Sequence, residues 1–102
     1  MNSEDAAPLF GVLSNSDRLD VIRALVEAGP DGMSAGAIAR KIGASPSRAS
    51  FHLAALSESG FAIRERRSRS LNYCVNFKTI GALMIFLMED CCQGSAELRN
   101  CC

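Results

Sequence analysis

Two short amphipathic segments joined by a tight turn, in the middle of the chain, constrain its fold more than any other feature. The first segment follows Ser34, a good N-cap, and carries apolar residues at the spacing of one helical face. These residues are Ala35, Ile38, Ala39 and Ile42. Gly43 marks a sharp turn before a second predicted helix, which Ser45 caps, Pro46 opens and Gly60 ends. Two helices connected in this way predict a helix-turn-helix.

The second helix of this pair has a polar and basic leading end. On a helical wheel, its buried stripe consists of Ala49, Leu53 and Leu56. Ser47 and Phe51 then point away from the core, and Arg48 is opposed by the positive end of the helix dipole, which suggests a negatively charged partner. Recognition helices present their first turns to base edges in a DNA groove. We therefore predict DNA contacts from one set of residues: Ser45, Ser47, Arg48, Ser50, Phe51 and His52.

Five of these predicted contacts have alternatives. Ser47 and Ser50 could lie on a solvated helix face without contacting DNA. Arg48 could be a solvated surface arginine. Phe51 could touch a thymine methyl group, or it could belong to the core if the helical phase differs by one position. His52, the only histidine in the chain, lies at the edge of the buried stripe, where it could be packed or bound to a phosphate.

Two further helices are predicted ahead of this motif. Pro8 suits the first turn of a helix whose apolar residues are Leu9, Phe10, Val12 and Leu13. Ser16 is the predicted N-cap of the next helix, Asp17 is favourable in its first turn, and Gly29–Pro30 ends it.

A basic hairpin and an apolar helix are predicted after the motif. Residues 61–67 and 71–76 alternate as two strands, with Ser68–Arg69–Ser70 between them. The hairpin arginines could contact phosphates or reach into a minor groove: Arg64, Arg66, Arg67 and Arg69. The predicted helix from Phe77 to about Asp90 is apolar almost all round and needs a second burial surface. The predicted fold is thus a mainly α winged helix-turn-helix (α-α-α-α-β-β-α) that dimerises through its first and last helices.

Charge is distributed unevenly along a chain whose net charge is zero. Residues 40–72 carry seven basic and two acidic side chains, whereas the rest of the chain carries four basic and nine acidic ones. A basic middle third is suited to a polyanion, although the protein as a whole is neutral.

Three stretches of the chain resemble the ArsR-type (arsenic-repressor) winged-helix regulators. They are L-S-N-S-D-R-L-D-V-I-R-A-L at 13–25, I-A-R-K-I-G-A-S-P-S-R-A-S-F-H-L-A-A-L-S-E-S-G-F at 38–61, and R-E-R-R-S-R-S-L-N-Y at 64–73. The resemblance implies a homodimeric repressor that binds an inverted-repeat operator and releases it when a metal or metalloid ion binds. Many members carry C-x-C on the third helix, where this chain has M-S-A-G-A-I-A-R, and most have glycine at the wing tip. The E-D-C-C-Q-G stretch resembles a subset that senses through cysteines after the last helix.

Four cysteines near the C-terminus are the candidate sensor: Cys91, Cys92, Cys101 and Cys102. Soft trivalent arsenic or antimony prefers thiolate sulfur, so we expect As(III), with Sb(III) as a variant, to be the inducer, and no organic cofactor. Zinc or cadmium, and a disulfide switch, remain alternatives, although Glu89 and Asp90 disfavour the thiolate that redox sensing needs. We expect residues 1–90 to form the folded domain and residues 91–102 a flexible tail. Cys74 is expected to be a packed residue.

Other classes of protein fit the sequence less well. No carboxylate pair, nucleophile-base constellation or phosphate loop predicts an enzyme. No apolar run reaches the roughly 18 residues of a membrane span, and no signal pattern opens the chain, so a cytoplasmic protein is expected. A cytosolic thiol protein that buffers metal is the rival of a different class.

Overall fold

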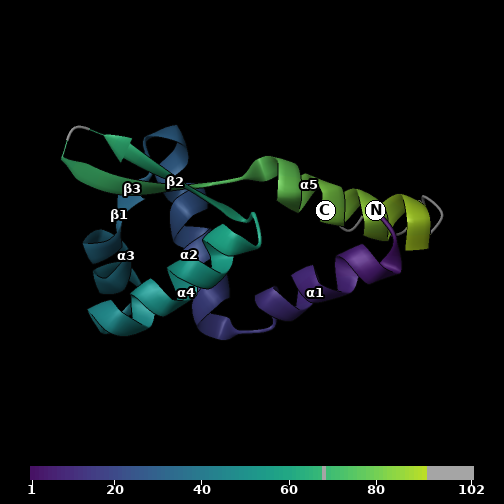
Figure 1. Cartoon of the computed structure of the whole chain (residues 1–102), viewed down its shortest axis with the longest axis horizontal. Coiled ribbons are helices and arrows are strands. Elements are labelled where there is room, and N and C mark those ends of the chain that lie inside the picture. Colours follow the sequence, from purple (N-terminus) through teal and green to yellow (C-terminus); the bar gives the residue numbers. More distant parts are fainter. Residues whose placement is uncertain (68, 92–102) are drawn as a thin grey trace.

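The computed structural model describes residues 1–67 and 69–91 of the chain. Figure 1 shows α2, α3 and α4 gathered against the strands at one end, while α1 and α5 extend together toward the other. The elements in chain order are α1 (Ser3–Leu13), α2 (Ser16–Ala28), the 3-10 turn η1 (Gly29–Asp31), β1 (Met33–Ser34), α3 (Ala35–Ile42), α4 (Pro46–Glu58), β2 (Ala62–Arg67), β3 (Ser70–Val75), α5 (Phe77–Ile85) and the π-helix η2 (Phe86–Cys91). The predicted winged helix-turn-helix, mainly helical with a small hairpin, is confirmed.

The first helix begins earlier than its proline suggested. The side chain of Asn2 accepts a hydrogen bond of 2.8 Å from the Asp5 N–H, and α1 therefore starts at Ser3. Glu4 and Asp5 lie in its first turn, where the helix dipole favours acids. Pro8 lies inside the helix, so the prediction that it opens the helix is wrong.

The second helix is capped one residue before the predicted position. Asn15, rather than Ser16, is the N-cap, and its side-chain oxygen accepts a hydrogen bond of 3.1 Å from the Arg18 N–H. Gly29 ends the helix as predicted, with its N–H bonded to the carbonyl of Leu25.

An unpredicted turn and strand connect α2 to α3. Gly29 and Gly32 bracket η1 with φ of 71° and 70° and ψ of −154° and −169°, a conformation that is almost confined to glycine. The chain then enters β1, where Met33 and Ser34 pair antiparallel with β3. A strand of two residues carries no readable periodicity, so the sequence does not reveal it. The resulting sheet has the order β1-β3-β2, with β3 in the middle.

The hairpin of β2 and β3 is the predicted wing, shifted by one residue at its boundaries. The pairing runs from Ala62 opposite Val75 to Arg67 opposite Ser70. Phe61, expected to open the first strand, instead lies just before it and is fully buried.

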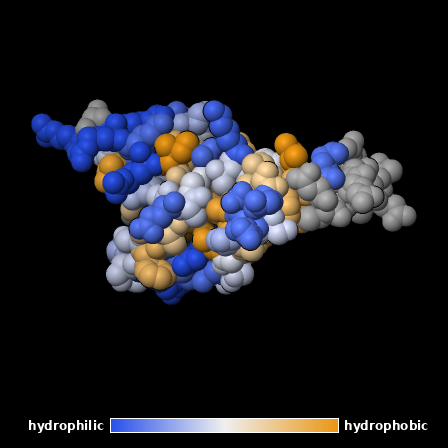
Figure 2. Space-filling model, turned by 45° about the vertical axis from the view of Figure 1, so that its right-hand side comes forward, coloured by the Kyte–Doolittle hydropathy of each residue, from blue (hydrophilic) through white to orange (hydrophobic). Residues whose placement is uncertain are grey.

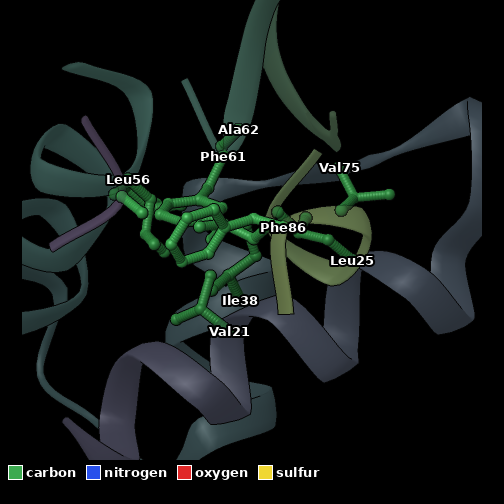
Figure 3. Close-up of a cluster of buried hydrophobic side chains, with 11 residues drawn as sticks. Val21, Leu25, Ile38, Leu56, Phe61, Ala62, Val75 and Phe86 are labelled. Carbon is green, nitrogen blue, oxygen red and sulfur yellow. The ribbon is translucent and has the colours of Figure 1, made fainter. Parts of the chain in front are cut away.

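The core lies where α2, α3, α4 and the base of the hairpin meet, and it extends to the last helix through Leu83 and Phe86 (Figure 3). Its largest fully buried side chains are Phe61, Leu25, Ile38, Leu53, Leu56, Leu83 and Val21. Phe61 also joins three elements through its backbone, since its N–H donates to Leu56 at the end of α4 and its carbonyl accepts from Asn76 ahead of α5. These two bonds link α4 to the start of the wing and to the residue before α5.

The last helix changes from α to π geometry before it ends. It begins at Phe77, after the N-cap Asn76, and becomes the π-helix η2 at Phe86. The predicted helix from Phe77 to about Asp90 is confirmed in its extent, and its last six residues have π rather than α geometry. Because the segment is apolar almost all round, its side chains show no period that distinguishes α from π geometry.

The protomer is elongated. Its radius of gyration is 14.8 Å, whereas about 13 Å is expected for a compact domain of this length. The extents are 45 × 23 × 23 Å, and the long axis runs from the wing to the end formed by α1, α5 and η2, which we call the arm (Figure 1). Within the described part of the chain, no helix combines the length and the apolarity that crossing a membrane requires.

Candidate nucleic-acid interface

The helix-turn-helix is built from capping interactions that the sequence predicts. The Ser34 hydroxyl accepts a hydrogen bond of 3.2 Å from the Ala37 N–H at the start of α3. Gly43 follows α3 in the left-handed conformation, with φ 69° and ψ 33°, which turns the chain sharply toward α4. Ser45 then caps α4 by accepting from the Arg48 N–H at 3.2 Å. The predicted helix-turn-helix and its caps are confirmed.

The two faces of α4 are those that its sequence predicts. Ala49, Leu53 and Leu56 are fully buried, which confirms the predicted buried stripe. Phe51 is 64% exposed, so its alternative place in the core is excluded. The leading half of α4 thus presents a mostly polar set of exposed side chains: Ser45, Ser47, Arg48, Ser50 and Phe51.

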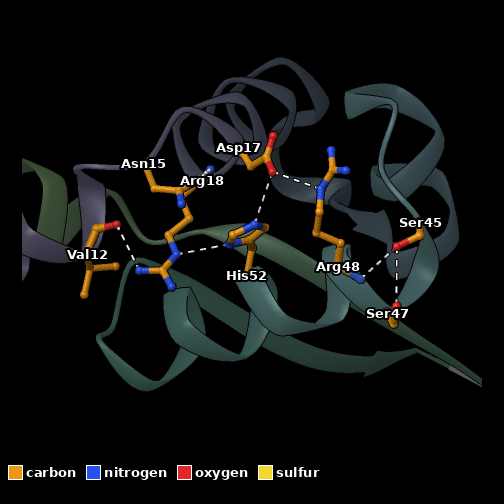
Figure 4. Close-up of polar contacts among 8 residues, drawn as sticks. All are labelled: Val12, Asn15, Asp17, Arg18, Ser45, Ser47, Arg48 and His52. Carbon is orange, nitrogen blue, oxygen red and sulfur yellow. Dashed lines mark hydrogen bonds and ion pairs between the residues drawn. The ribbon is translucent and has the colours of Figure 1, made fainter.

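His52 lies inside the protein rather than on the expected DNA-contacting surface. It is only 5% exposed. Its Nδ1 accepts a hydrogen bond of 3.2 Å from Arg18 Nε, and its Nε2 lies 3.3 Å from Asp17 Oδ2 (Figure 4). Because Nδ1 is an acceptor, the ring proton is on Nε2 and faces the carboxylate. His52 therefore joins α4 to α2, and its predicted role as a DNA contact is corrected.

Asp17 and Arg18 connect α2 to the exposed side of α4. The same Oδ2 of Asp17 that faces His52 lies 3.0 Å from Arg48 Nε. Arg18 lies with its guanidinium carbon 5.7 Å from the centre of the Phe51 ring, within cation–π range. It also donates to the carbonyl of Val12 at 3.3 Å, at the end of α1. Arg18 therefore contacts both the arm and α4.

Strand register divides the wing arginines between the two faces of the hairpin. Arg64 and Arg66 lie on the same face as Tyr73, because side chains alternate along a strand. Arg67 lies on the opposite face, where it donates to the Pro30 carbonyl at 3.0 Å and lies 3.7 Å from a carboxylate oxygen of Asp31. Arg67 therefore ties the wing to η1, whereas its predicted contact with DNA stays a prediction. Arg69 is exposed at the hairpin turn.

A groove of about 640 Å³ separates α4 from the wing. Its lining comes from both elements: Ser50, Ala54, Ser57, Glu58, Ala62, Arg64 and Tyr73. Arg64 therefore faces the same space as the polar side of α4. Figure 2 shows the hairpin end as a hydrophilic projection from the body of the protein.

Most of the candidate sensor lies outside the described residues. Cys91 ends η2, but its side chain and residues 92–102 are not described, so the predicted set of Cys91, Cys92, Cys101 and Cys102 stays a prediction. Among the residues that the structure describes, no group of three histidine, cysteine or acidic side chains could hold a metal ion. Cys74 is half-buried, and its thiol donates to the Pro30 carbonyl at 3.5 Å, which fits the expected packed residue.

The sequence did not reveal the roles of Asp17, Arg18 and Asp31 at this surface. Asp17 was expected only to favour the start of α2, yet it contacts two residues of α4. These contacts join residues that are more than 30 positions apart, and no local pattern of the chain signals them.

Comparisons with known proteins agree with this architecture. Residues 13–66 match the family described as "Helix-turn-helix domain". No curated protein matches the sequence at a significant level. An ArsR-like transcriptional regulator from Rhodococcus sp. RHA1 is 21% identical, with a TM-score of 0.77 over 95% of this chain and 89% of that protein.

Two further solved structures are similar. The transcriptional repressor BigR from Xylella fastidiosa is 26% identical, with a TM-score of 0.69 over 91% of this chain and 90% of its own. A homodimeric winged helix-turn-helix DNA-binding domain from Mycobacterium bovis is 21% identical, with a TM-score of 0.65 over 85% of this chain and 84% of its own. The chain therefore belongs to the helix-turn-helix domain family, and its fold is that of the ArsR-type winged-helix transcriptional regulators, which are DNA-binding proteins and not enzymes.

Proposed function

We propose that this protein is a homodimeric repressor that binds an inverted-repeat operator and releases it when trivalent arsenic or antimony binds the C-terminal cysteines. Two observations carry the DNA-binding part: the leading half of α4 is exposed and polar, and its Ser50 lines one groove with Arg64 of the wing. A helix of this kind fits a major groove, and a basic hairpin beside it fits the adjacent backbone or minor groove.

Each exposed group of this surface has a chemical role in DNA binding. The hydroxyls of Ser45, Ser47 and Ser50 can donate to phosphate oxygens at the groove edge. Arg48 can donate to a base edge, and Phe51 can pack against a thymine methyl group. The wing contributes phosphate contacts through Arg64, Arg66 and Arg69.

A dimer is supported by the apolar surface and the elongated shape of the protomer. The arm exposes large apolar side chains, with Phe77 and Ile85 60% exposed and Met84 43% exposed. Surface of this kind on a small protein marks a protein–protein contact. The similar domain from Mycobacterium bovis is homodimeric. Two copies of α4 about 34 Å apart would match successive major grooves on one side of the duplex.

Arsenic is the proposed inducer because the cysteines concentrate soft sulfur ligands at the end of the arm. Cys91 is the last residue of η2, and Cys92, Cys101 and Cys102 follow it in the sequence. Thiolate sulfur prefers soft ions. Metalloid bound next to the arm would alter the relative orientation of the two subunits, and a coupling of about 1 to 3 kcal/mol is typical of such regulation.

The test is a titration of the protein on a fluorescent operator, selected from random duplexes, followed by addition of candidate inducers. We expect sequence-specific binding, and release by arsenite or antimonite at lower concentration than by zinc, cadmium or an oxidant. Release by zinc or cadmium alone would reassign the inducer. The absence of any preference for one DNA sequence would identify the rival, a metal-buffering thiol protein.

A further inference from the structure

Asp17 occupies an unusual position for a residue of α2. One of its carboxylate oxygens is shared by two side chains of α4, with Arg48 Nε at 3.0 Å and His52 Nε2 at 3.3 Å (Figure 4). The side chain of His52 is only 6% exposed, and Arg18 holds the other nitrogen of its ring. The carboxylate is therefore fixed in place by a buried ring.

From this geometry we propose that Asp17 is a positioning residue. It orients Arg48 to donate hydrogen bonds to a guanine edge rather than to a phosphate. The inference rests on the proposed entry of α4 into a major groove. A guanidinium group has one Nε–H and two terminal NH2 groups. Because Asp17 occupies Nε, the two terminal nitrogens stay available, and this pair matches the O6 and N7 acceptors of guanine.

The charge of Asp17 favours the same outcome. A carboxylate beside Arg48 disfavours the approach of a phosphate, which is also negative, whereas a guanine edge is neutral. The side chain of Arg48 is 50% exposed and that of Asp17 is 29% exposed, so the arginine is the more accessible member of the pair. Holding an arginine in one orientation before binding also lowers the conformational entropy that it loses on binding.

The other groups around Arg48 do not compete for its terminal nitrogens. The Ser45 hydroxyl accepts from the Arg48 backbone N–H, not from its side chain. Ser45 and Ser47 face each other at 3.4 Å. Arg18 donates to the other nitrogen of the His52 ring, and its guanidinium has no acceptor for the N–H groups of Arg48. Within the described residues, Asp17 is the carboxylate that forms an ion pair with Arg48.

The experiment compares two DNA affinities for each variant of the full-length protein. One duplex is the operator selected by the wild-type protein, and the other is a scrambled duplex of equal length and composition. For Asp17→Ala we expect the operator affinity to fall about tenfold, the low end of what a bidentate arginine–guanine pair discriminates. The affinity for the scrambled duplex should stay unchanged or rise, because the variant carries one negative charge fewer near the DNA.

Two further measurements separate positioning from folding. In a double-mutant cycle, Asp17→Ala should add no further loss of specificity to Arg48→Ala, because both remove the same interaction. Replacing the contacted guanine by 7-deazaguanine, which lacks N7, should weaken binding by the wild-type protein and leave binding by Arg48→Ala unchanged. Asp20→Ala is the matched control, since it removes the same charge from an exposed position of α2.

Three results would overturn the inference. An Asp17→Ala variant with the wild-type ratio of operator to scrambled affinity would show that Arg48 needs no positioning. An equal fall in both affinities would assign Asp17 a structural role only. A wild-type protein without any sequence preference would overturn the proposed function together with this inference, and that outcome is distinguishable from the first two.

Discussion

Arg67, on the wing, donates a hydrogen bond of 3.0 Å to the main-chain carbonyl of Pro30, in the turn that follows α2. It also lies near the carboxylates of Asp31 and Glu65, at 3.7 and 3.5 Å. Its neighbour Arg66 projects from the opposite face of the same strand, the face that lines the groove beside α4. Two consecutive arginines of one strand therefore have different roles.

The pair Arg66→Ala and Arg67→Ala tests this division. Arg66→Ala should weaken operator binding and reduce the slope of log affinity against log salt by about 0.9 for each phosphate that is no longer neutralised. Arg67→Ala should leave that slope nearly unchanged and accelerate hydrogen exchange of β3 amides, because the wing then loses the bond of Arg67 to η1 and keeps those of Asn72 and Cys74. Binding titrations at several salt concentrations and hydrogen-exchange mass spectrometry provide the two readouts. Equal reductions of the slope would show that Arg67 also reaches phosphate.

Gly32 should tolerate no side chain. It has a φ of 70°, and a Cβ atom there would lie 2.6 Å from the Tyr73 carbonyl oxygen and 2.7 Å from Cys74 Sγ. Gly32→Ala should lower the free energy of unfolding by about 2 kcal/mol or more. Gly36→Ala is the control, because its Cβ would meet only the end of the Arg40 side chain at 3.5 Å, and it should be neutral or stabilising by up to about 1 kcal/mol. Urea unfolding at one fixed protein concentration measures both. A neutral Gly32→Ala would contradict the close contact with β3.

Ile85→Glu should disrupt the proposed dimer. Ile85 is 60% exposed on the arm, and a buried charge without a partner is costly at an interface. We expect a monomer by light scattering, with operator affinity reduced at least tenfold because each protomer then binds one half-site alone. Val26→Glu is the control, since Val26 is 45% exposed on α2 and should leave the mass unchanged. A dimeric Ile85→Glu would place the interface elsewhere.

Cys91→Ser should uncouple release from DNA binding. The substitution removes one proposed sulfur ligand and lies far along the chain from α4, so operator affinity should stay at the wild-type value while arsenite no longer causes release. Cys74→Ser is the control, because Cys74 lies on the wing, where it packs against the Pro30 carbonyl. This variant should release the operator at the wild-type arsenite concentration. Fluorescence anisotropy of the protein–operator complex during arsenite addition measures both. Release of Cys91→Ser at the wild-type arsenite concentration would remove Cys91 from the sensor.

The sequence predicted those parts of the fold that depend on neighbouring residues. The caps Ser34 and Ser45 bond to backbone groups three positions away, and helical spacing alone identifies the buried stripe of α4. Local signals can also mislead when two compete. Pro8 indicated a helix start, but the cap at Asn2 decided where α1 begins.

The parts that sequence could not predict depend on contacts between distant positions. Strand β1 exists because β3 pairs with it, and the inward place of His52 depends on Asp17 and Arg18 of another helix. The separation of Arg66 from Arg67 follows from alternation along a strand, but the sequence does not show that η1 lies under one face of the hairpin. Composition identified the basic middle third of the chain. Only the fold shows which of its arginines face the groove and which contact η1.

Because the protomer is elongated, a small rotation at one end produces a large displacement at the other. With the arm at one end and the wing at the other, a rotation of ~4.3° about one end of a 45 Å body moves the opposite end by about 3.4 Å, the rise of one base pair. A rotation of this size at the arm would thus displace the wing by a full base step.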